Sequence, residues 1–325
     1  MTVAVAAPAL RLLAEHDVTF PCMGCSFRLR VGGRDAAAAA SAARAQLEDF
    51  DARLSRFRPD SELSRLNADP RAVVPASPLL RLTVRAALRA AARTDGLVDP
   101  TLVGALERAG YDRSLAGATT GSVAAALHSA PSRRPARPRP HAPWRAVRVD
   151  DAAGAIARPP GLRLDSGGVG KGLAADLVAA LLAHGGRHRF AVDAAGDLRL
   201  GGTRTAVRPH EVEIAHPWAA EPIGMLRLRA GGVATSGIGS RLWSTPGGGF
   251  AHHLLDPATG EPAWTGLVAA TALAPTARAA ETLAKAALLS GPLGARRWLA
   301  RHGGVVVHDD GTPEWIGPVT RLRSA

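Results

Sequence analysis

The sequence is poor in aromatic residues and in cysteine, and it has no long apolar run. Aromatic residues make up 4% of the chain, too few for the interleaved rings on which nucleic-acid-binding surfaces stack bases. The only cysteines are Cys22 and Cys25, and without a second pair they cannot supply the four ligands of a structural zinc site. We expect them to be a structural pair of small residues. No apolar stretch is long enough to span a bilayer.

Acidic residues are scarce relative to basic ones, which gives a formal net charge of +12. Such a charge is typical of nucleic-acid-binding proteins, but no nucleic-acid-binding module is recognisable. The arginines are spread along the chain and are densest in segment 114–143, which is also rich in proline. We interpret 114–143 as an exposed, extended insertion within a single domain, 1–325. We expect anionic small molecules rather than nucleic acids as partners.

The N-terminus does not resemble an export signal. Met1 to Leu13 contains small apolar residues but no basic residues before them, which is untypical of a secretory signal peptide. A lipidated cysteine at Cys22 would need a continuous apolar run before it, and Glu15 and Asp17 interrupt that run. We therefore expect a cytoplasmic protein.

The chain is organised around a glycine-rich stretch that leads into an amphipathic segment ending near His184. The stretch reads Leu164-Asp165-Ser166-Gly167-Gly168-Val169-Gly170-Lys171-Gly172. Alternating Leu162 and Leu164 predict a strand before it, and the segment after it predicts a helix. Glycines let backbone N–H groups approach a ligand, a helix start offers unpaired donors, and the lysine adds a full positive charge. The pattern predicts a phosphate-binding loop.

Two known phosphate loops fit this stretch poorly. A Walker A loop needs Ser or Thr after its lysine, and Gly172 stands there. The G-x-G-x-x-A form of a Rossmann loop matches 170–175, and Asp193 lies near the expected position of a ribose-binding acid. However, regular alternation of strands and helices does not continue after it, so a Rossmann domain is not favoured.

Periodicity predicts the remaining elements. Residues 19–31 alternate as a strand does, and Asp35 caps an alanine-rich helix that ends near Phe57. Ser77 opens a helix that Gly96 closes, and Asp99 opens a shorter one that ends by Gly110. Further strands are predicted at 147–149, 155–157, 190–193, 198–200, 223–228 and 233–235.

Taken in order, the motifs resemble those of the ApbE-type flavin transferases, which move FMN from FAD to a protein hydroxyl. The matching stretches are Met23-Gly24, Leu54-Ser55-Arg56-Phe57 with 61–67, Val98-Asp99-Pro100-Thr101, 165–172, Ala195-Gly196-Asp197, Ala234-Thr235-Ser236-Gly237 and 253–260. Each motif is weak by itself, and the ordered set is specific. The resemblance covers nearly the whole chain outside 114–143.

The resemblance implies a fold, a reaction and a cofactor site. The implied fold is α+β, with mixed, mainly antiparallel sheets flanked by helices, in two intimately joined lobes with the cofactor between them. The implied reaction cleaves FAD, attaches FMN through a phosphoester to Ser or Thr of a partner protein, and releases AMP. The implied cofactor-binding residues are Met23, Phe57, Asn67, Asp165, Gly167, Gly168, Lys171, Asp197, Thr235, Ser236, Gly237 and His253.

For three of these residues, the chemistry of the side chain indicates a role independently of the resemblance. The Lys171 ammonium can donate to a phosphate, and the Asp197 carboxylate can accept from a ribose hydroxyl or a flavin N–H. His253 lies three residues before Asp256, a carboxylate that can orient an imidazole. We predict Lys171, His253 and Asp256 as catalytic residues, with His253 or Asp256 orienting or deprotonating the acceptor. His252 has no counterpart in the family and is expected to be a packing or surface residue.

The sequence departs from the family where magnesium would bind. The family places an Asp where this chain has Glu281 and a Thr where it has Lys285, and these two residues with a backbone carbonyl near Gly170 would hold Mg²⁺. One-turn spacing puts Glu281 and Lys285 on one helix face. Lys285 stands at the position of a metal ligand but cannot be one, because an ammonium has no lone pair with which to bind a metal ion and its positive charge repels the ion.

Three outcomes are open at this position. Lys285 turns to solvent and leaves a weaker magnesium site, or its ammonium occupies the metal position and pairs with Glu281, or flavin is bound without transfer. The two alternatives to FMN transfer are thus a FAD-binding protein without transferase activity and a FAD pyrophosphatase.

Overall fold

The computed structural model describes residues 15–115, 121–245, 247–319 and 321–322. The N-terminal segment on which we base the absence of an export signal lies largely outside these residues. The core of the structure is one eight-stranded sheet, with strand order β1-β2-β6-β7-β10-β13-β14-β15. The strands are β1 Glu15–Cys22, β2 Cys25–Gly32, β6 Arg189–Ala194, β7 Asp197–Gly201, β10 Gly231–Gly237, β13 Leu267–Ala274, β14 Gly304–His308 and β15 Pro313–Ile316.

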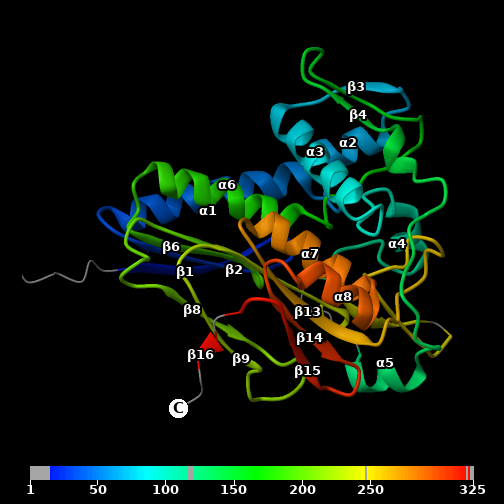
Figure 1. The fold of residues 1–325 in the computed structure, drawn as a ribbon. Helices are drawn as coiled ribbons and strands as arrows, with labels where there is room; N and C mark the ends of the chain where they lie inside the picture. The colour runs from blue at the N-terminus through cyan, green and yellow to red at the C-terminus, as the bar shows by residue number, and fades with distance from the viewer. Residues whose placement is uncertain (1–14, 116–120, 246, 320, 323–325) are drawn as a thin grey trace, which may run out of the picture.

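Four helices pack along this sheet. They are α1 Ala36–Leu54, α6 Gly170–His184, α7 Ala277–Leu289 and α8 Gly291–Leu299. Helix α1 contacts β1 and β2, α6 contacts β6 and β7, α7 contacts β10 and β13, and α8 contacts β13 and β14. Helix α6 also packs against both α1 and α7, and so it lies at the middle of the helical layer (Figure 1).

A smaller antiparallel sheet packs against the large one. Its strands are β8 His210–Ile214, β9 Gly224–Leu228 and β16 Arg321–Leu322. Val212 and Leu226 of this sheet share an apolar cluster with Val233, Leu273 and Val305 of the large sheet. In Figure 1 the small sheet lies on the side opposite α1 and α6.

Short elements form the rest of the chain. They are α2 Glu62–Ala68, β3 Val73–Pro75, α3 Pro78–Arg93, α4 Val103–Arg108, α5 Val123–Ser129, β4 Arg148–Asp150, β5 Ala155–Ala157, β11 Leu242–Ser244 and β12 Phe250–His252, with 3-10 turns at Pro143–Ala146 and Ile238–Ser240. The hydroxyls of Ser61 and Ser77 accept from the backbone N–H groups of Ser64 and Leu80 and so cap α2 and α3.

Two large apolar cores divide the molecule into two joined lobes. One is built from β1, β2, β6, α1, α3 and α6, and the other from β10, β13, β14, α7 and α8. The predicted α+β class with mainly antiparallel sheets is confirmed, since every strand pair among the described residues is antiparallel. This pairing excludes a Rossmann domain, which needs parallel strands. No helix in the described ranges is long and apolar enough to cross a membrane.

Two predicted strands are wrong. Residues 19–31 form a hairpin, because Met23 and Gly24 both have positive φ and turn the chain so that Cys22 pairs with Cys25. Residues 162–164 form no strand. Instead, the Asn67 side chain accepts from Leu164 N and donates to Leu164 O, both at 2.8 Å, so a side chain satisfies the backbone groups that a neighbouring strand would otherwise pair.

The segment 114–143 has no regular secondary structure over residues 130–139, and it is not wholly exposed. Residues 116–120 lie outside the described ranges, and α5 is helical. Ala126 and Ala136 are buried, and the backbone N–H groups of Arg134 and Ala136 donate to Trp264 O and Leu289 O. The segment is therefore hydrogen-bonded onto the second lobe although most of its side chains face solvent.

Candidate functional site

The first turn of α6 meets α7 where the two lobes join. A Cβ at Gly172 would lie 2.6 Å from Arg278 N, so only glycine lets these two backbones approach so closely. Asp176, one turn further on, accepts from the N–H groups of Ala277 and Arg278 at 2.9 and 3.2 Å. The start of α6 is thus fixed against the start of α7.

Four charged side chains gather at this junction, and we call Lys171, Asp197, Glu281 and Lys285 the charge cluster. Lys171 Nζ lies 2.8 Å from Asp197 Oδ2, and Lys285 Nζ donates to Glu281 Oε1 at 2.8 Å. Glu281 Oε2 accepts from Gly172 N at 2.9 Å. The Asp197 and Glu281 side chains are only 2% and 1% exposed, so both carboxylates depend on these partners rather than on water.

The composition makes this cluster unusual within the chain. Lys171 and Lys285 are the only lysines in the sequence, and every other basic side chain that is permanently charged is arginine. Burial disfavours the Lys171 ammonium, but the attraction of Asp197 and Glu281 outweighs it and raises the pKa of Lys171 above its usual value. Burial raises the pKa of Asp197 above its usual value. The positive charges of Lys171 and Lys285 lower this pKa, and the negative charge of Glu281 raises it. The four groups therefore act on one another, and Lys171 stays charged.

His253 lies next to the charge cluster. It follows β12, and its N–H donates to Arg241 O at 3.3 Å. Burial first, and then His252, Lys285 and Lys171, hold the pKa of His253 well below its usual value. Its Nδ1 is buried and has no hydrogen-bond partner in the described part of the chain. His253 is therefore held as a neutral imidazole, with Nδ1 buried and without a partner among the described residues.

The predicted pairing of His253 with Asp256 is not formed. Asp256 is buried, and its Oδ1 accepts from the N–H groups of Arg137 and Ala258 at 2.9 and 3.0 Å. No hydrogen bond joins it to His253 among the described residues. Asp256 instead closes its own turn and holds segment 114–143 in place. His252 packs its ring edge-on against Trp264 at 4.8 Å, which confirms it as a packing residue.

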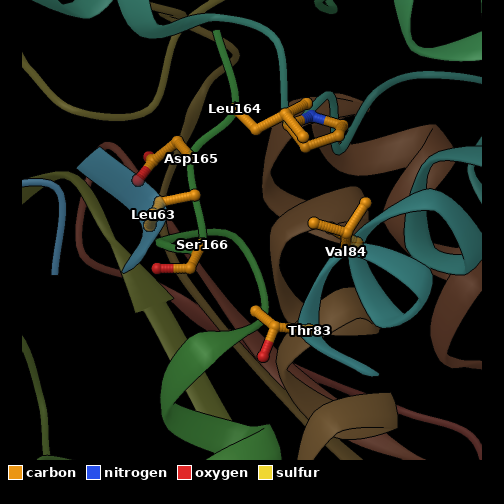
Figure 2. Close-up of a pocket in the computed structure, with 8 residues that line it drawn as sticks. Leu63, Thr83, Val84, Leu164, Asp165 and Ser166 are labelled. Atoms are coloured by element: carbon orange, nitrogen blue, oxygen red, sulfur yellow. The ribbon is translucent and has the colours of Figure 1, made fainter. Parts of the chain in front are cut away.

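Asp165 lies at the start of the glycine loop. Its Oδ1 accepts from Gly167 N at 3.1 Å and lies 3.6 Å from Arg56 Nε. Behind it is a small, largely apolar pocket lined by Leu63, Thr83, Val84, Ala87, Pro100, Leu164, Asp165 and Ser166. Figure 2 shows the Asp165 carboxylate pointing away from Val84. The pocket is a packing feature, and the carboxylate faces away from it.

The loop amides are already partly engaged. Gly167 N donates to Asp165, and Gly172 N donates to Glu281. Gly168 packs close to Val98, since a Cβ there would lie 3.2 Å from its side chain. The predicted strand before the loop is missing, whereas the helix after it is confirmed as α6.

Met23 contacts the loop from the β1–β2 turn. A Cβ on Gly170 would lie 3.4 Å from Met23 Cε, so the methionine covers the glycine. Beside it, Arg241 donates to Gly24 O at 3.1 Å and to Cys25 Sγ at 2.9 Å. Both cysteines are free, and burial raises the pKa of Cys22 to about 12. This arrangement fits the predicted structural role of the pair.

Aromatic side chains border the site on the Asp165 side. The Phe57 and Tyr111 rings lie 5.3 Å apart, and Trp243 stacks on Tyr111 at 5.7 Å. The Arg56 guanidinium lies 4.1 Å from the centre of the Phe57 ring and 4.6 Å from that of Tyr111. Phe57 is among the residues predicted from the sequence, whereas Arg56, Tyr111, Trp243 and Arg241 are not. Arg56 stands in a quoted motif, while the other three carry no local signal.

The remaining predicted residues are less closely tied to the charge cluster. Asn67 uses both polar atoms on Leu164 and so positions the loop. Thr235 and Ser236 lie on β10, where the Thr235 hydroxyl pairs with that of Thr271 at 2.8 Å and Ser236 is buried. Gly237 ends the same strand.

The charge cluster does not fit a magnesium ion. Glu281 has one oxygen bonded to an ammonium and the other to a backbone N–H, and a dication on either oxygen would lie within a few ångströms of Lys285. At such distances like charges repel strongly when partly buried. The described residues contain no group of three or more His, Cys, Asp and Glu side chains that could hold a metal. Gly170, Glu281 and Lys285 therefore do not form the predicted metal site as they stand.

The fold is similar to that of solved ApbE structures. The fold is similar to that of the ApbE protein of Thermotoga maritima, with a TM-score of 0.77, 24% identity, and coverage of 93% of this chain and 97% of the other. It is also similar to the apo form of the flavinyl transferase ApbE of Pseudomonas stutzeri, with a TM-score of 0.74, 24% identity, and coverage of 97% and 96%.

Sequence comparison identifies the family. Residues 23–307 match the ApbE family, and this chain belongs to it. The FAD:protein FMN transferase of Salmonella typhimurium is 29% identical over 96% of this chain and 89% of its own length. That of Escherichia coli K12 is 28% identical over 91% and 85%.

Proposed function

We propose that this protein is an FAD:protein FMN transferase. It takes FAD as substrate, joins FMN to a Ser or Thr hydroxyl of an acceptor protein, and releases AMP. Membership of the ApbE family and the activity named for its relatives support this assignment. The observation within the molecule that supports it most is the charged Lys171 ammonium, held at the start of α6 between the two lobes.

In this proposal the diphosphate lies against Lys171 and the backbone of Gly167 and Gly168. An ammonium offers three donors, and phosphate oxygens are strong charge-assisted acceptors. The flavin ring lies against the apolar residues around the loop, Met23 and Phe57 among them. Thr235, Ser236 and Gly237 line its polar edge, and Asp165 and Asp197 are the carboxylates available to ribose hydroxyls or ring N–H groups.

The transfer step forms one bond and breaks one. The acceptor hydroxyl oxygen bonds to the phosphorus on the FMN side of the diphosphate, the bridging P–O bond breaks, and AMP leaves with that bridging oxygen. The proton of the hydroxyl goes to the His253 imidazole, whose pKa rises when the negative diphosphate lies beside Lys171 and Lys285, the two cations that lower it. Lys171 stabilises the charge that develops on the phosphate oxygens. Asp256 acts only by shaping the turn after His253.

Magnesium, which the family resemblance implies, would supply a cation at the leaving and transferring oxygens. By that resemblance, Glu281 and a backbone carbonyl near Gly170 would hold the ion. Because Lys285 stands beside Glu281, we derive no step through the metal.

The test is to incubate the protein with FAD and an acceptor peptide and to measure AMP and peptide-bound flavin together. The proposal predicts equal amounts of both, and neither when the acceptor residue is replaced by alanine. AMP without peptide-bound flavin would indicate a pyrophosphatase. FAD binding without AMP under any condition would indicate a binding protein, and either result would overturn the proposal.

A further inference from the structure

The Lys285 ammonium sits in a place where a lysine is costly. Its side chain is 12% exposed, and its partner Glu281 is 1% exposed. Burying an ion pair loses the hydration of both charges, and apolar residues of similar size are often more stable in such a position. An ordinary i,i+4 surface pair would not need this burial. Stability therefore gives no reason for Lys285 to be here.

The location of Lys285 gives a functional reason. The charge of Lys285 lowers the pKa of Asp197 and of His253, and the charge of Lys171 does the same. The two ammonium groups therefore lie near the same two side chains. One of its three donors is used on Glu281, the only hydrogen bond that Lys285 makes in the described part of the chain. The donors that remain can serve phosphate oxygens.

Glu281 holds that ammonium in place from the other side. It is fixed at both oxygens, by Lys285 and by Gly172 N at the start of α6. The close packing of Gly172 on α7 sets the distance between the two helices. The ammonium is therefore preorganised by the backbone, as a cation must be if it is to stabilise developing charge without reorganising.

We propose that Lys285 is a built-in cation that takes the place of a divalent metal ion at the diphosphate of FAD. This inference rests on the proposed function and goes beyond it, because it makes FAD binding and FMN transfer independent of added divalent metal. Lys171 and Lys285 then supply two positive charges to the diphosphate, while Asp197 and Glu281 hold the two ammonium groups in place through their ion pairs.

Three variants of the full chain test the proposal. Lys285→Met removes the charge and keeps the length of the side chain. Lys285→Met combined with Glu281→Gln removes both charges, so that no unpaired carboxylate is left buried. Lys285→Thr removes the ammonium and supplies an oxygen that can bind a metal. FAD affinity is measured from the change in flavin fluorescence, in excess chelator and in magnesium, with heat melting to confirm folding.

The wild type is expected to bind FAD equally well in chelator and in magnesium, within about twofold. In chelator, Lys285→Met and the double variant are expected to bind FAD about tenfold or more weakly, since each loses a charged hydrogen bond to phosphate. Lys285→Thr is expected to be weak in chelator and to recover in magnesium. AMP release should follow the same order.

Two results would overturn the inference alone. One is a wild type that loses FAD on chelation and regains it with magnesium. The other is a folded double variant that binds FAD in chelator as tightly as the wild type does. If the wild type binds no FAD in either condition, the proposed function fails together with this inference.

Discussion

At the scale of single residues, the chemistry depends on which side chains pair. The sequence places Lys171 and Asp197 twenty-six positions apart, and nothing local indicates that they form an ion pair. The glycine loop and the helix after it could be predicted because their signals are local. The pairing of Asp256 with the backbone of Arg137 could not, because it depends on where a distant proline-rich segment folds back.

Replacing His253 with glutamine should slow FMN transfer about a hundredfold or more, because the neutral imidazole would no longer accept the hydroxyl proton. FAD affinity should change little. The measurement is the single-turnover rate of AMP release with acceptor peptide. His252→Gln is a poor control because that ring is buried, so the exposed His184→Gln serves instead. Full transfer rates in the His253 variant would remove it from the mechanism.

Replacing Lys171 with methionine should weaken FAD binding about tenfold or more, since it removes a charged donor to phosphate. The change also leaves Asp197 buried without its cation, which costs stability. Lys171→Arg keeps the charge and is the matched control. Equal FAD affinity for the methionine and arginine variants would contradict the role given to Lys171.

At the scale of helices and strands, the site depends on the contact between α6 and α7. Helix α6 begins at Gly170 with no side-chain cap, and its Gly172 N–H is satisfied by Glu281 from α7 instead. Capping signals read from sequence cannot reveal such a partner. The hairpin at Met23 could not be predicted for a different reason. Apolar and polar side chains still alternate along β2, so residues 19–31 resemble one continuous strand.

Gly172→Ala should destabilise the fold. Helix propensity alone would favour alanine by about 1 kcal/mol, but the new Cβ would lie 2.6 Å from Arg278 N. Backbone cannot move aside as a flexible side chain can, so we expect a net loss of about 1–3 kcal/mol. Gly247→Ala is the control, because nothing lies within 4 Å of a Cβ there. Denaturant unfolding measures both, and a stabilised Gly172→Ala would contradict the close contact.

At the scale of the whole molecule, an antiparallel sheet joins two cores, and the site lies where they meet. Periodicity predicts helices α1, α3, α4 and α6, and Ser77 caps α3 as expected, but Asp35 makes no side-chain cap at α1. The α+β class was implied by the resemblance to the family, and the order of the strands does not follow from the sequence. Strands β7 and β10 are neighbours although twenty-nine residues separate them. No local signal in the sequence indicates a pairing between such distant strands, and the resemblance to the family implied the class of fold without a strand order.

Two buried histidines make the whole fold sensitive to acid. Burial lowers the pKa of His210 to about 4 and that of His252 to about 3, whereas an unfolded chain binds these protons near pH 6.5. The two neutral histidines therefore cost no unfolding free energy above pH 6.5. Below pH 6.5 the free energy of unfolding falls, down to about pH 4 for His210 and about pH 3 for His252.

The loss of unfolding free energy between pH 6.5 and 4 should therefore be smaller in His210→Gln than in the wild type. The difference should be on the order of 3 kcal/mol at most. Urea unfolding across this range measures the slope, with His184→Gln as the exposed control. An unchanged slope in His210→Gln would show that this histidine does not contribute.

The most direct test of the whole account is the melting temperature of the wild-type chain as FAD is added in chelator. A ligand held between the two cores stabilises both, by about 2.7 kcal/mol at one hundred times its Kd. We predict a single transition that moves upward by several degrees with FAD and does not move with riboflavin, which lacks the diphosphate. A transition that FAD leaves in place both in chelator and in added magnesium, or that riboflavin raises equally, would contradict a diphosphate site at the start of α6.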